Sequence, residues 1–379
     1  MKHLLLLLLC CLSLTAAAQP WRQMKTLDDA PFLHNKAYQK GNKYQRDAIL
    51  FVDMLADTHP YYAKRARRDS LLSTQPALLK ACGKCKSDSA FSQLLYGVLG
   101  RLHDKHTDLM DTVTYGVRLR EKMAQKAAEP LPHDEGIMAR HDALFDYTLL
   151  PEHSLCYLQL NQCADARTQR DASLPRFDVL LEEMFGAIDS LGIATLVVDA
   201  QYNNGGNSGL CTELLLHLCR AEQLRDFTTY LRFSRLMEMY NPGVATVRQQ
   251  WEAEGHADEM YCRPTPPMPP IEGQKIYGGR VVFVMSERTY SSAGMLMTLA
   301  RDNHIGTIVG TTSSFPPSHY GEVLPYVLPN TGVFGTVCCK YFARPDVTHL
   351  EDEVLEPDVR LDLTDKAAAW QYILTHYGK

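Results

Sequence analysis

The sequence lacks a strong excess of charge of either sign. Its 379 residues include 39 Lys and Arg and 44 Asp and Glu, which leaves a net charge of −5. The short basic run 65–68 (Arg-Ala-Arg-Arg) is typical of a solvated helix face. Binding to nucleic acid or to an anionic membrane surface is therefore not expected. The hydrophobic content of 45% instead indicates a globular chain with a substantial core.

Long apolar runs are missing beyond the N-terminus, so no transmembrane segment is expected. The first 18 residues differ from the rest. Lys2 and His3 precede the apolar run Leu4–Leu14, and three alanines, Ala16–Ala18, follow it before Gln19. This pattern is typical of a signal peptide. We expect residues 1–18 to be removed and the mature protein to be exported, either periplasmic or secreted.

Paired cysteine motifs are also missing. Cys82 and Cys85 have CxxC spacing, but no second CxxC accompanies them. A local disulfide or two plain thiols are therefore favoured over a metal site. Of the 11 cysteines, Cys10 and Cys11 lie in the signal peptide, and the nine that remain are an odd number. At least one thiol is then free or paired between chains.

Two N-terminal segments have apolar residues at helical spacing. One predicted helix includes residues 48–55 and stops at His59-Pro60, and another includes residues 91–102. We predict a small α-helical N-terminal domain over residues 19–120. An irregular polar stretch follows, and we interpret residues 121–150 as a connector.

After residue 150 the pattern changes to alternating apolar runs and amphipathic segments. This alternation predicts an α/β domain with a largely parallel sheet over residues 151–379. Strands are predicted over 155–160, 194–198, 281–285 and 306–309, and helices over 177–191, 208–219 and 292–302.

Two of the strand-to-helix connections carry residues suited to catalysis. Gly205 and Gly206 follow one strand, and Ser291 and Ser292 follow another. Ligands collect at this edge of an open α/β sheet. Glycines let the backbone approach a substrate carbonyl closely, while a serine can attack that carbonyl. The alternatives are a tight turn for the glycines and a helix cap for the serines.

A catalytic serine needs a base, and His106 is the candidate because Asp104 lies close to it in sequence. His103 and His106 are also candidate metal ligands, but the further ligands of a metal site are not evident nearby. A third group that orients the imidazole would be acidic. The run 351–353 (Glu-Asp-Glu) offers candidates that spacing does not separate.

Four motifs match one known family in its order. They are His59-Pro60 after a helix, 104–107 (Asp-Lys-His-Thr), 197–206 (Val-Val-Asp-Ala-Gln-Tyr-Asn-Asn-Gly-Gly), and 289–294 (Thr-Tyr-Ser-Ser-Ala-Gly). The chain thus resembles the C-terminal-processing, or tail-specific, serine peptidase family. The resemblance implies a ClpP/crotonase-like α/β catalytic domain after the small α-helical N-terminal domain. No segment that resembles a PDZ domain is apparent.

The resemblance also implies roles for single residues. Ser291 matches the nucleophile and His106 matches the histidine of the family branch that uses Ser, His and Glu. Glu351 lies six positions before Pro357, as the glutamate of that branch does. Ser292 is the competing nucleophile. No cofactor and no metal are implied. The backbone N–H groups expected to hold the oxyanion are those of Gly205, Gly206 and Ser292.

The chain departs from the family at three positions. The lysine of Ser–Lys members falls at Pro316, so a Ser–Lys mechanism is not expected. The loop arginine falls at Gln201, and an acidic residue falls at Gly294. We predict an exported serine peptidase that hydrolyses peptide bonds in a peptide or protein substrate. One alternative is a catalytically inactive homologue that binds a peptide or another ligand in the same cleft. Another is a hydrolase that acts on a different ester or amide.

Overall fold

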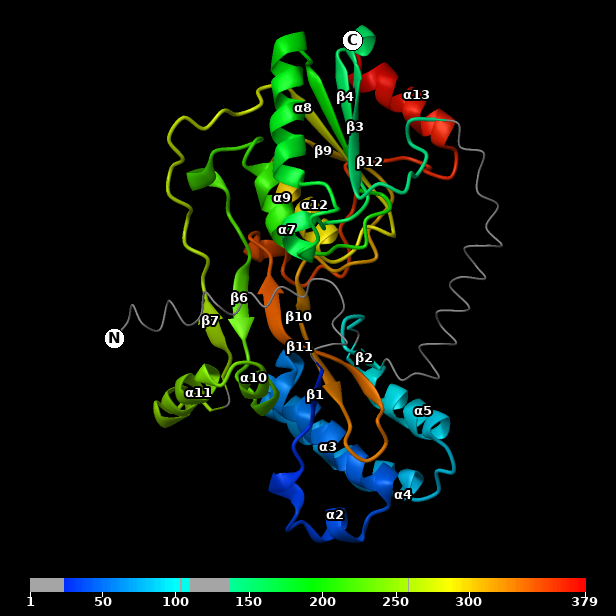
Figure 1. Cartoon of the computed structure of the whole chain (residues 1–379), viewed down its shortest axis with the longest axis vertical. Coiled ribbons are helices and arrows are strands. Elements are labelled where there is room, and N and C mark those ends of the chain that lie inside the picture. The colour runs from blue at the N-terminus through cyan, green and yellow to red at the C-terminus, as the bar shows by residue number, and fades with distance from the viewer. Residues whose placement is uncertain (1–23, 103, 110–135, 258) are drawn as a thin grey trace.

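The strands of the protein form two sheets, one in the upper half of Figure 1 and the other in the lower half. This computed structural model describes residues 24–102, 104–109, 136–257 and 259–379. The predicted mixed α/β fold with a helical N-terminal part is confirmed. The predicted signal peptide, His103 and the first half of the connector, residues 121–135, lie outside the described residues.

The first sheet has the strand order β12-β9-β8-β5-β4-β3. Its strands are parallel except for β3, which pairs antiparallel with β4. Because the carboxyl ends of parallel strands lie at one edge, the loops that follow β5 and β8 meet there. The strands are β3 (Phe145–Leu150), β4 (Leu155–Leu160), β5 (Thr195–Asp199), β8 (Arg280–Met285), β9 (Thr307–Gly310) and β12 (Val359–Arg360).

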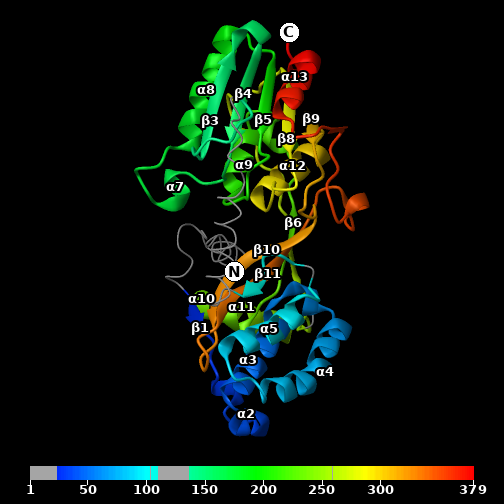
Figure 2. The ribbon, with the colours of Figure 1, turned by 90° about the vertical axis from the view of Figure 1, so that its right-hand side faces the viewer.

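Both faces of this sheet are buried, as its continuous apolar runs predict. Successive side chains of a strand point to opposite faces. Leu158, Val198 and Phe283 pack into one core with α8 (Phe177–Leu191), α9 (Ser208–Leu215) and α12 (Ser292–Asp302). Tyr157, Val197 and Val282 pack into another core with α13 (Lys366–Tyr377). Figure 2 shows α8 and α13 on opposite sides of the strands. The short helix α7 (Ala166–Gln169) precedes α8.

The second sheet is mostly antiparallel and has the order β1-β10-β11-β6-β7, with β2 also paired to β11. The long hairpin of β10 and β11 extends from the middle of the molecule into its lower half (Figure 1). The strands are β1 (Lys25–Thr26), β2 (Asp108–Leu109), β6 (Thr228–Leu231), β7 (Tyr261–Arg263), β10 (His319–Val327) and β11 (Phe334–Ala343).

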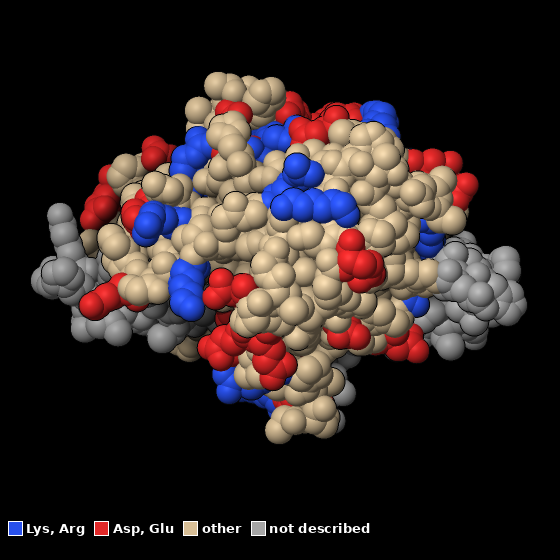
Figure 3. Space-filling model, turned by 90° about the horizontal axis from the view of Figure 1, so that it is seen from above, with Lys and Arg blue, Asp and Glu red and all other residues tan. Residues whose placement is uncertain are grey.

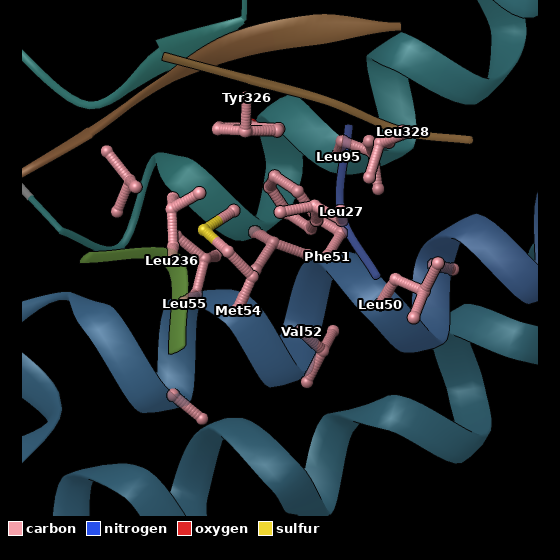
Figure 4. Packing of buried hydrophobic residues seen from close by; sticks show 14 of the residues in the cluster. Leu27, Leu50, Phe51, Val52, Met54, Leu55, Leu95, Leu236, Tyr326 and Leu328 are labelled. Atoms are coloured by element: carbon pink, nitrogen blue, oxygen red, sulfur yellow. The ribbon is translucent and has the colours of Figure 1, made fainter. Parts of the chain in front are cut away.

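The N-terminal helices pack against this second sheet. Leu50, Phe51 and Met54 of α3 lie in one core with Leu236 and Tyr326 (Figure 4). Leu236 and Tyr326 come from the region assigned to the catalytic domain in sequence, so the helical part shares its core with later segments. The helices of the lower half are α2 (Lys36–Lys40), α3 (Lys43–Thr58), α4 (Arg65–Cys82), α5 (Asp88–Leu99), α10 (Arg235–Tyr240) and α11 (Gly243–Ala253).

The cysteines, the longest helices and the surface charges of the described chain bear on earlier expectations. Cys82 and Cys85 are free thiols, as are the other cysteines of the described chain. No helix within the described ranges is long and apolar enough to cross a membrane. Acidic and basic side chains are interspersed over the face shown in Figure 3. The helix predicted over 208–219 is shorter than expected, since α9 ends at Leu215.

Candidate active site

Ser291 lies on a strained turn between β8 and α12. Its backbone has φ 54° and ψ −125°, a conformation that residues other than glycine rarely adopt. β8 ends at Met285 in the buried sheet, and α12 begins at Ser292. The side chain of Ser291 is half-buried, so the turn presents its hydroxyl at the edge of the sheet. Strain of this kind is typical of a functional position.

The glycine loop after β5 lies directly against this turn. Gly205 has φ +97°, and a Cβ atom added to it would lie 2.6 Å from the Cβ of Ser291. Only glycine therefore permits the two backbones to approach this closely. Asn203 holds the loop in place, because its Oδ1 accepts the N–H of Gly205 at 2.8 Å and its carbonyl accepts the N–H of Tyr290 at 2.9 Å.

His106 reaches the same place from the second sheet. It precedes β2, and its carbonyl accepts a hydrogen bond from the Thr336 hydroxyl of β11 at 2.7 Å. The Thr107 hydroxyl accepts the N–H of Cys338 at 3.0 Å. These contacts place the His106 Nε2 atom 3.2 Å from the Oγ atom of Ser291, although the two residues are 185 positions apart in sequence. The predicted nucleophile and base are thus in hydrogen-bonding contact.

Aromatic side chains surround the His106 ring. The Tyr290 hydroxyl lies 3.4 Å from His106 Nδ1. Phe315 packs edge-on against the His106 ring, with centroids 5.8 Å apart, and against Tyr290 at 4.9 Å. Gly294 makes room for Phe315, since a Cβ atom there would lie 2.3 Å from the Phe315 ring. The absence of an acidic side chain at Gly294 therefore has a steric reason in this chain.

Ser292 has a different environment from Ser291. Its side chain is buried, and its hydroxyl donates to the Gly206 carbonyl at 2.8 Å. The three amides predicted to hold an oxyanion also differ from one another. The Gly205 N–H donates a hydrogen bond to Asn203 Oδ1. The N–H groups of Gly206 and Ser292 have no hydrogen-bond acceptor among the described residues.

Glu351 is not brought to the histidine in this structure. It lies just after the short 3₁₀ helix η6 (Val347–His349), and its side chain is exposed. Within the described ranges, no hydrogen bond or ion pair joins Glu351 to His106. The carboxylate beside the His106 ring is that of Asp104, whose Oδ1 atom lies 3.6 Å from Nδ1. The assignment of Glu351 as the third catalytic group remains a prediction.

The other departures from the family pattern are accommodated locally. Gln201 is buried and donates from Nε2 to Asp199 Oδ2 at 2.6 Å. The Tyr157 hydroxyl donates to the same Asp199 oxygen. Burial raises the pKa of Asp199, although these hydrogen bonds oppose the shift. Pro316 follows Phe315, so the position of the family lysine carries no amine.

Two buried residues near the site belong to motifs of the sequence but had no predicted catalytic role. His59 Nε2 lies 3.1 Å from Asp104 Oδ2, and both side chains are almost fully buried. In the sequence, these residues stand out as members of two family motifs, His59-Pro60 and Asp104 to Thr107. The sequence does not show that these two motifs meet, because 45 positions separate His59 from Asp104.

His59, Asp104 and Cys338 also have the composition of a metal site, with donor atoms within 4.8 Å of one another. Metals bind the thiolate form of cysteine. Burial raises the pKa of the Cys338 thiol well above its ordinary value, so the sulfur keeps its proton. The nitrogen and oxygen donors are already hydrogen-bonded to each other. His59 and Asp104 are thus paired with each other without a metal ion.

Comparisons with known proteins concern the family and the fold of the chain. The model of peptidase family S41 matches residues 154–361, more than half of the chain. That segment contains Ser291, the glycine loop and Glu351, whereas His106 lies before it. No curated protein matches the chain in sequence.

Solved structures resemble most of the chain in fold. Mature CPAF complexed with lactacystin has a TM-score of 0.61 at 12% identity, covering 88% of this chain and 97% of that one. The photosystem II D1 C-terminal processing protease has a TM-score of 0.50 at 12% identity, covering 85% and 94%. A lipoprotein from Streptococcus agalactiae has a TM-score of 0.51 at 12% identity, covering 86% and 95%. At such low identity these similarities concern the fold alone.

Proposed function

The chain belongs to peptidase family S41 and is a serine-type peptidase, and we propose that Ser291 and His106 hydrolyse peptide bonds in an exported enzyme. The contact of 3.2 Å between Ser291 Oγ and His106 Nε2 carries the proposal. A nucleophile and its base must lie within this range for proton transfer to accompany attack.

In the first step Ser291 Oγ attacks the peptide carbonyl, while His106 Nε2 takes the hydroxyl proton. The histidine then gives that proton to the leaving amine, and an acyl-enzyme remains on Ser291. Water releases the acid by the reverse sequence, with His106 again acting as the base. The half-buried position of Ser291 leaves its hydroxyl accessible to a peptide.

The oxyanion that forms during attack needs hydrogen-bond donors close to Ser291. The N–H groups of Gly206 and Ser292 are proposed for this role, because they lie on the two backbones that meet at the turn and have no acceptor in the described part of the chain. The resemblance also implied the Gly205 N–H as an oxyanion donor. To act in this way, that group would first have to break its hydrogen bond to Asn203 Oδ1.

Glu351 is retained as the proposed third catalytic group on the strength of the resemblance alone. Its exposed position means that the loop after η6 would have to bring the carboxylate to His106 when substrate binds. The variant Glu351→Gln tests this role. A rate of acylation equal to that of the wild type would exclude Glu351 from the mechanism.

Export is proposed from the signal-peptide pattern of residues 1–18. Expression of the whole chain in a bacterial host with an export pathway should yield a mature protein that begins at Gln19. N-terminal sequencing of the extracytoplasmic fraction measures this. A full-length protein confined to the cytoplasm would contradict export without affecting the catalytic proposal.

A fluorophosphonate probe tests the catalytic proposal directly, because it reacts with activated serines. Peptide mapping of the labelled protein should find the adduct on Ser291. Labelling should vanish in Ser291→Ala and His106→Ala but persist in Ser292→Ala. His376→Ala is the matched control, since this histidine is exposed and lies on α13.

A folded wild type that the probe does not label would overturn the proposal. The site would then favour the alternative of an inactive homologue that binds a peptide or another ligand in the same cleft. An adduct on Ser292 in place of Ser291 would reassign the nucleophile. Turnover of esters without turnover of peptides would change the substrate class and keep the residues.

A further inference from the structure

A buried carboxylate lies behind the proposed base. The Asp104 side chain is only 3% exposed. It accepts three hydrogen bonds, from the backbone N–H of His106 at 2.9 Å, the N–H of Thr107 at 3.1 Å and His59 Nε2 at 3.1 Å. It also lies 3.6 Å from His106 Nδ1. Burial raises the pKa of this carboxyl, but the hydrogen bonds from His106, His59 and Thr107 outweigh it, so the net pKa is well below the ordinary value. Asp104 therefore carries a negative charge inside the protein.

The tautomer of His59 follows from its partners. Its Nδ1 atom accepts the backbone N–H of Tyr61 at 3.1 Å and so carries no proton. Burial lowers the pKa of His59, while the nearby Asp104 opposes this effect. The neutral ring then has its proton on Nε2 and donates it to Asp104 Oδ2. The sharp end of α3 at His59-Pro60 holds the ring at this position.

His106 is held by Asp104 in two ways. The hydrogen bond to its backbone N–H sets where the residue lies. The carboxylate 3.6 Å from Nδ1 favours a proton on that nitrogen, and the Tyr290 hydroxyl oxygen, 3.4 Å away, can accept that proton in a hydrogen bond. A proton on Nδ1 leaves Nε2 free to accept from Ser291 Oγ. The same negative charge stabilises the imidazolium that forms when Ser291 gives up its proton.

We infer that His59 and Asp104 are positioning residues that set the tautomer and orientation of His106 for its reaction with Ser291. This inference rests on the proposed function. His59 fixes the carboxylate, and the carboxylate fixes the base. His59 touches neither Ser291 nor a substrate carbonyl, and it acts entirely through Asp104.

The other ionisable groups near the His106 ring are uncharged. Burial raises the pKa of the Tyr290 phenol, which stays protonated. Burial also lowers the pKa of His319 to about 3, so this neighbour is neutral at ordinary pH. Asp104 is thus the source of negative charge in contact with His106 among the described residues.

The test compares Asp104→Asn, His59→Leu and His59→Gln in the folded mature protein. The glutamine can present an N–H near the position of the His59 Nε2 atom, whereas leucine cannot. His217→Leu is the matched control, because this half-buried histidine stacks on Phe185 in the other core. Thermal unfolding identifies any variant that fails to fold, and the rate of fluorophosphonate acylation is measured for each variant that folds.

Asp104→Asn should slow acylation on the order of 10²-fold, the scale of a mispositioned catalytic group. His59→Leu should slow acylation on the order of 10-fold, as expected for the loss of one hydrogen bond to a charged group. His59→Gln should restore most of this loss, and His217→Leu should leave the rate unchanged.

A second measurement does not depend on activity. Correlation spectra of protein labelled with ¹⁵N-histidine should show His59 as the Nε2–H tautomer and His106 as the Nδ1–H tautomer. In Asp104→Asn the His106 tautomer should change. An unchanged His106 tautomer in Asp104→Asn would overturn the inference, as would full activity in His59→Leu. A wild type that shows these tautomers but no probe labelling would refute the proposed function alone.

Discussion

The glycine at position 294 provides a sharp test of how packing supports the site. Gly294 lies in the first turn of α12, three residues after Ser291. A Cβ atom at this position would lie 2.3 Å from Cδ1 of Phe315. The ring of Phe315 contacts both His106 and Tyr290, so any movement of Phe315 is transmitted to the proposed base. The variant Gly294→Ala adds one methyl group at this point.

The size of the effect follows from two opposing terms. Carbon atoms in contact normally lie about 3.5–4.0 Å apart, so the Phe315 ring has to move by more than about 1 Å. Overpacking of this kind costs roughly 1–3 kcal/mol. Replacing glycine by alanine in a helix returns up to about 1 kcal/mol. We expect Gly294→Ala to lower the free energy of unfolding by about 1–2 kcal/mol and to slow acylation by roughly 10- to 100-fold.

Gly186→Ala is the matched control for this variant. Gly186 also lies inside a helix, α8, but it is exposed, and a Cβ atom added there would meet no neighbouring atom within 4 Å. Without a clash, this substitution should raise the free energy of unfolding by roughly 0.5–1 kcal/mol. Urea unfolding gives both free energies, and the fluorophosphonate probe gives both rates.

The reasoning is refuted if Gly294→Ala is as stable and as reactive as Gly186→Ala. That result would mean that Phe315 moves without strain and that its position does not affect His106. A variant that is destabilised but reacts at the wild-type rate would show that the packing of Phe315 affects stability and not the reactivity of Ser291.

Three further predictions concern other parts of the structure. Ser292→Ala should lose about 1 kcal/mol of stability in urea unfolding, because the hydrogen bond to the Gly206 carbonyl is removed, while probe labelling of Ser291 persists. Burial lowers the pKa of His319 to about 3, so unfolded chains bind a proton there at pH values where folded chains do not. The free energy of unfolding should therefore fall by roughly 1 kcal/mol per unit as pH decreases from about 6 to 3, and His319→Phe should reduce this slope. Cys262 is the exposed thiol among the nine free cysteines, so one thiol should react rapidly with Ellman's reagent in the native protein, and Cys262→Ser should abolish that phase.

Much of the α/β part was predictable because its signals are local. The strand Leu155–Leu160 and the helices Phe177–Leu191 and Ser292–Asp302 have the predicted bounds. Their side chains are apolar on the faces that the sheet and helices bury, and periodicity in the sequence records this directly. The second sheet was not predicted. Its long strands β10 and β11 carry polar and aromatic residues in no simple alternation, and β1 and β2 have only two residues each.

The predicted division at residues 120 and 151 stays a prediction, but the hydrophobic cores of the structure do not follow the order of the chain. Leu236 and Tyr326 were assigned to the catalytic domain because they lie within residues 151–379 of the sequence. In the structure they share a core with Phe51 of α3. Proximity in a sequence does not show which core an apolar side chain joins, since that depends on where the whole segment returns in space.

The sequence alone determined the turn that displays Ser291 and the glycine loop beside it, because both follow buried strands and are encoded within a few residues. The tertiary structure decided which histidine meets the serine and which carboxylate meets the histidine. His106 reaches Ser291 because β2 pairs with β11, and the carboxylate of Asp104 lies 3.6 Å from the His106 ring. The contact between Ser291 and His106 joins segments next to two different sheets. It depends on how those sheets pack, which no local pattern of residues specifies.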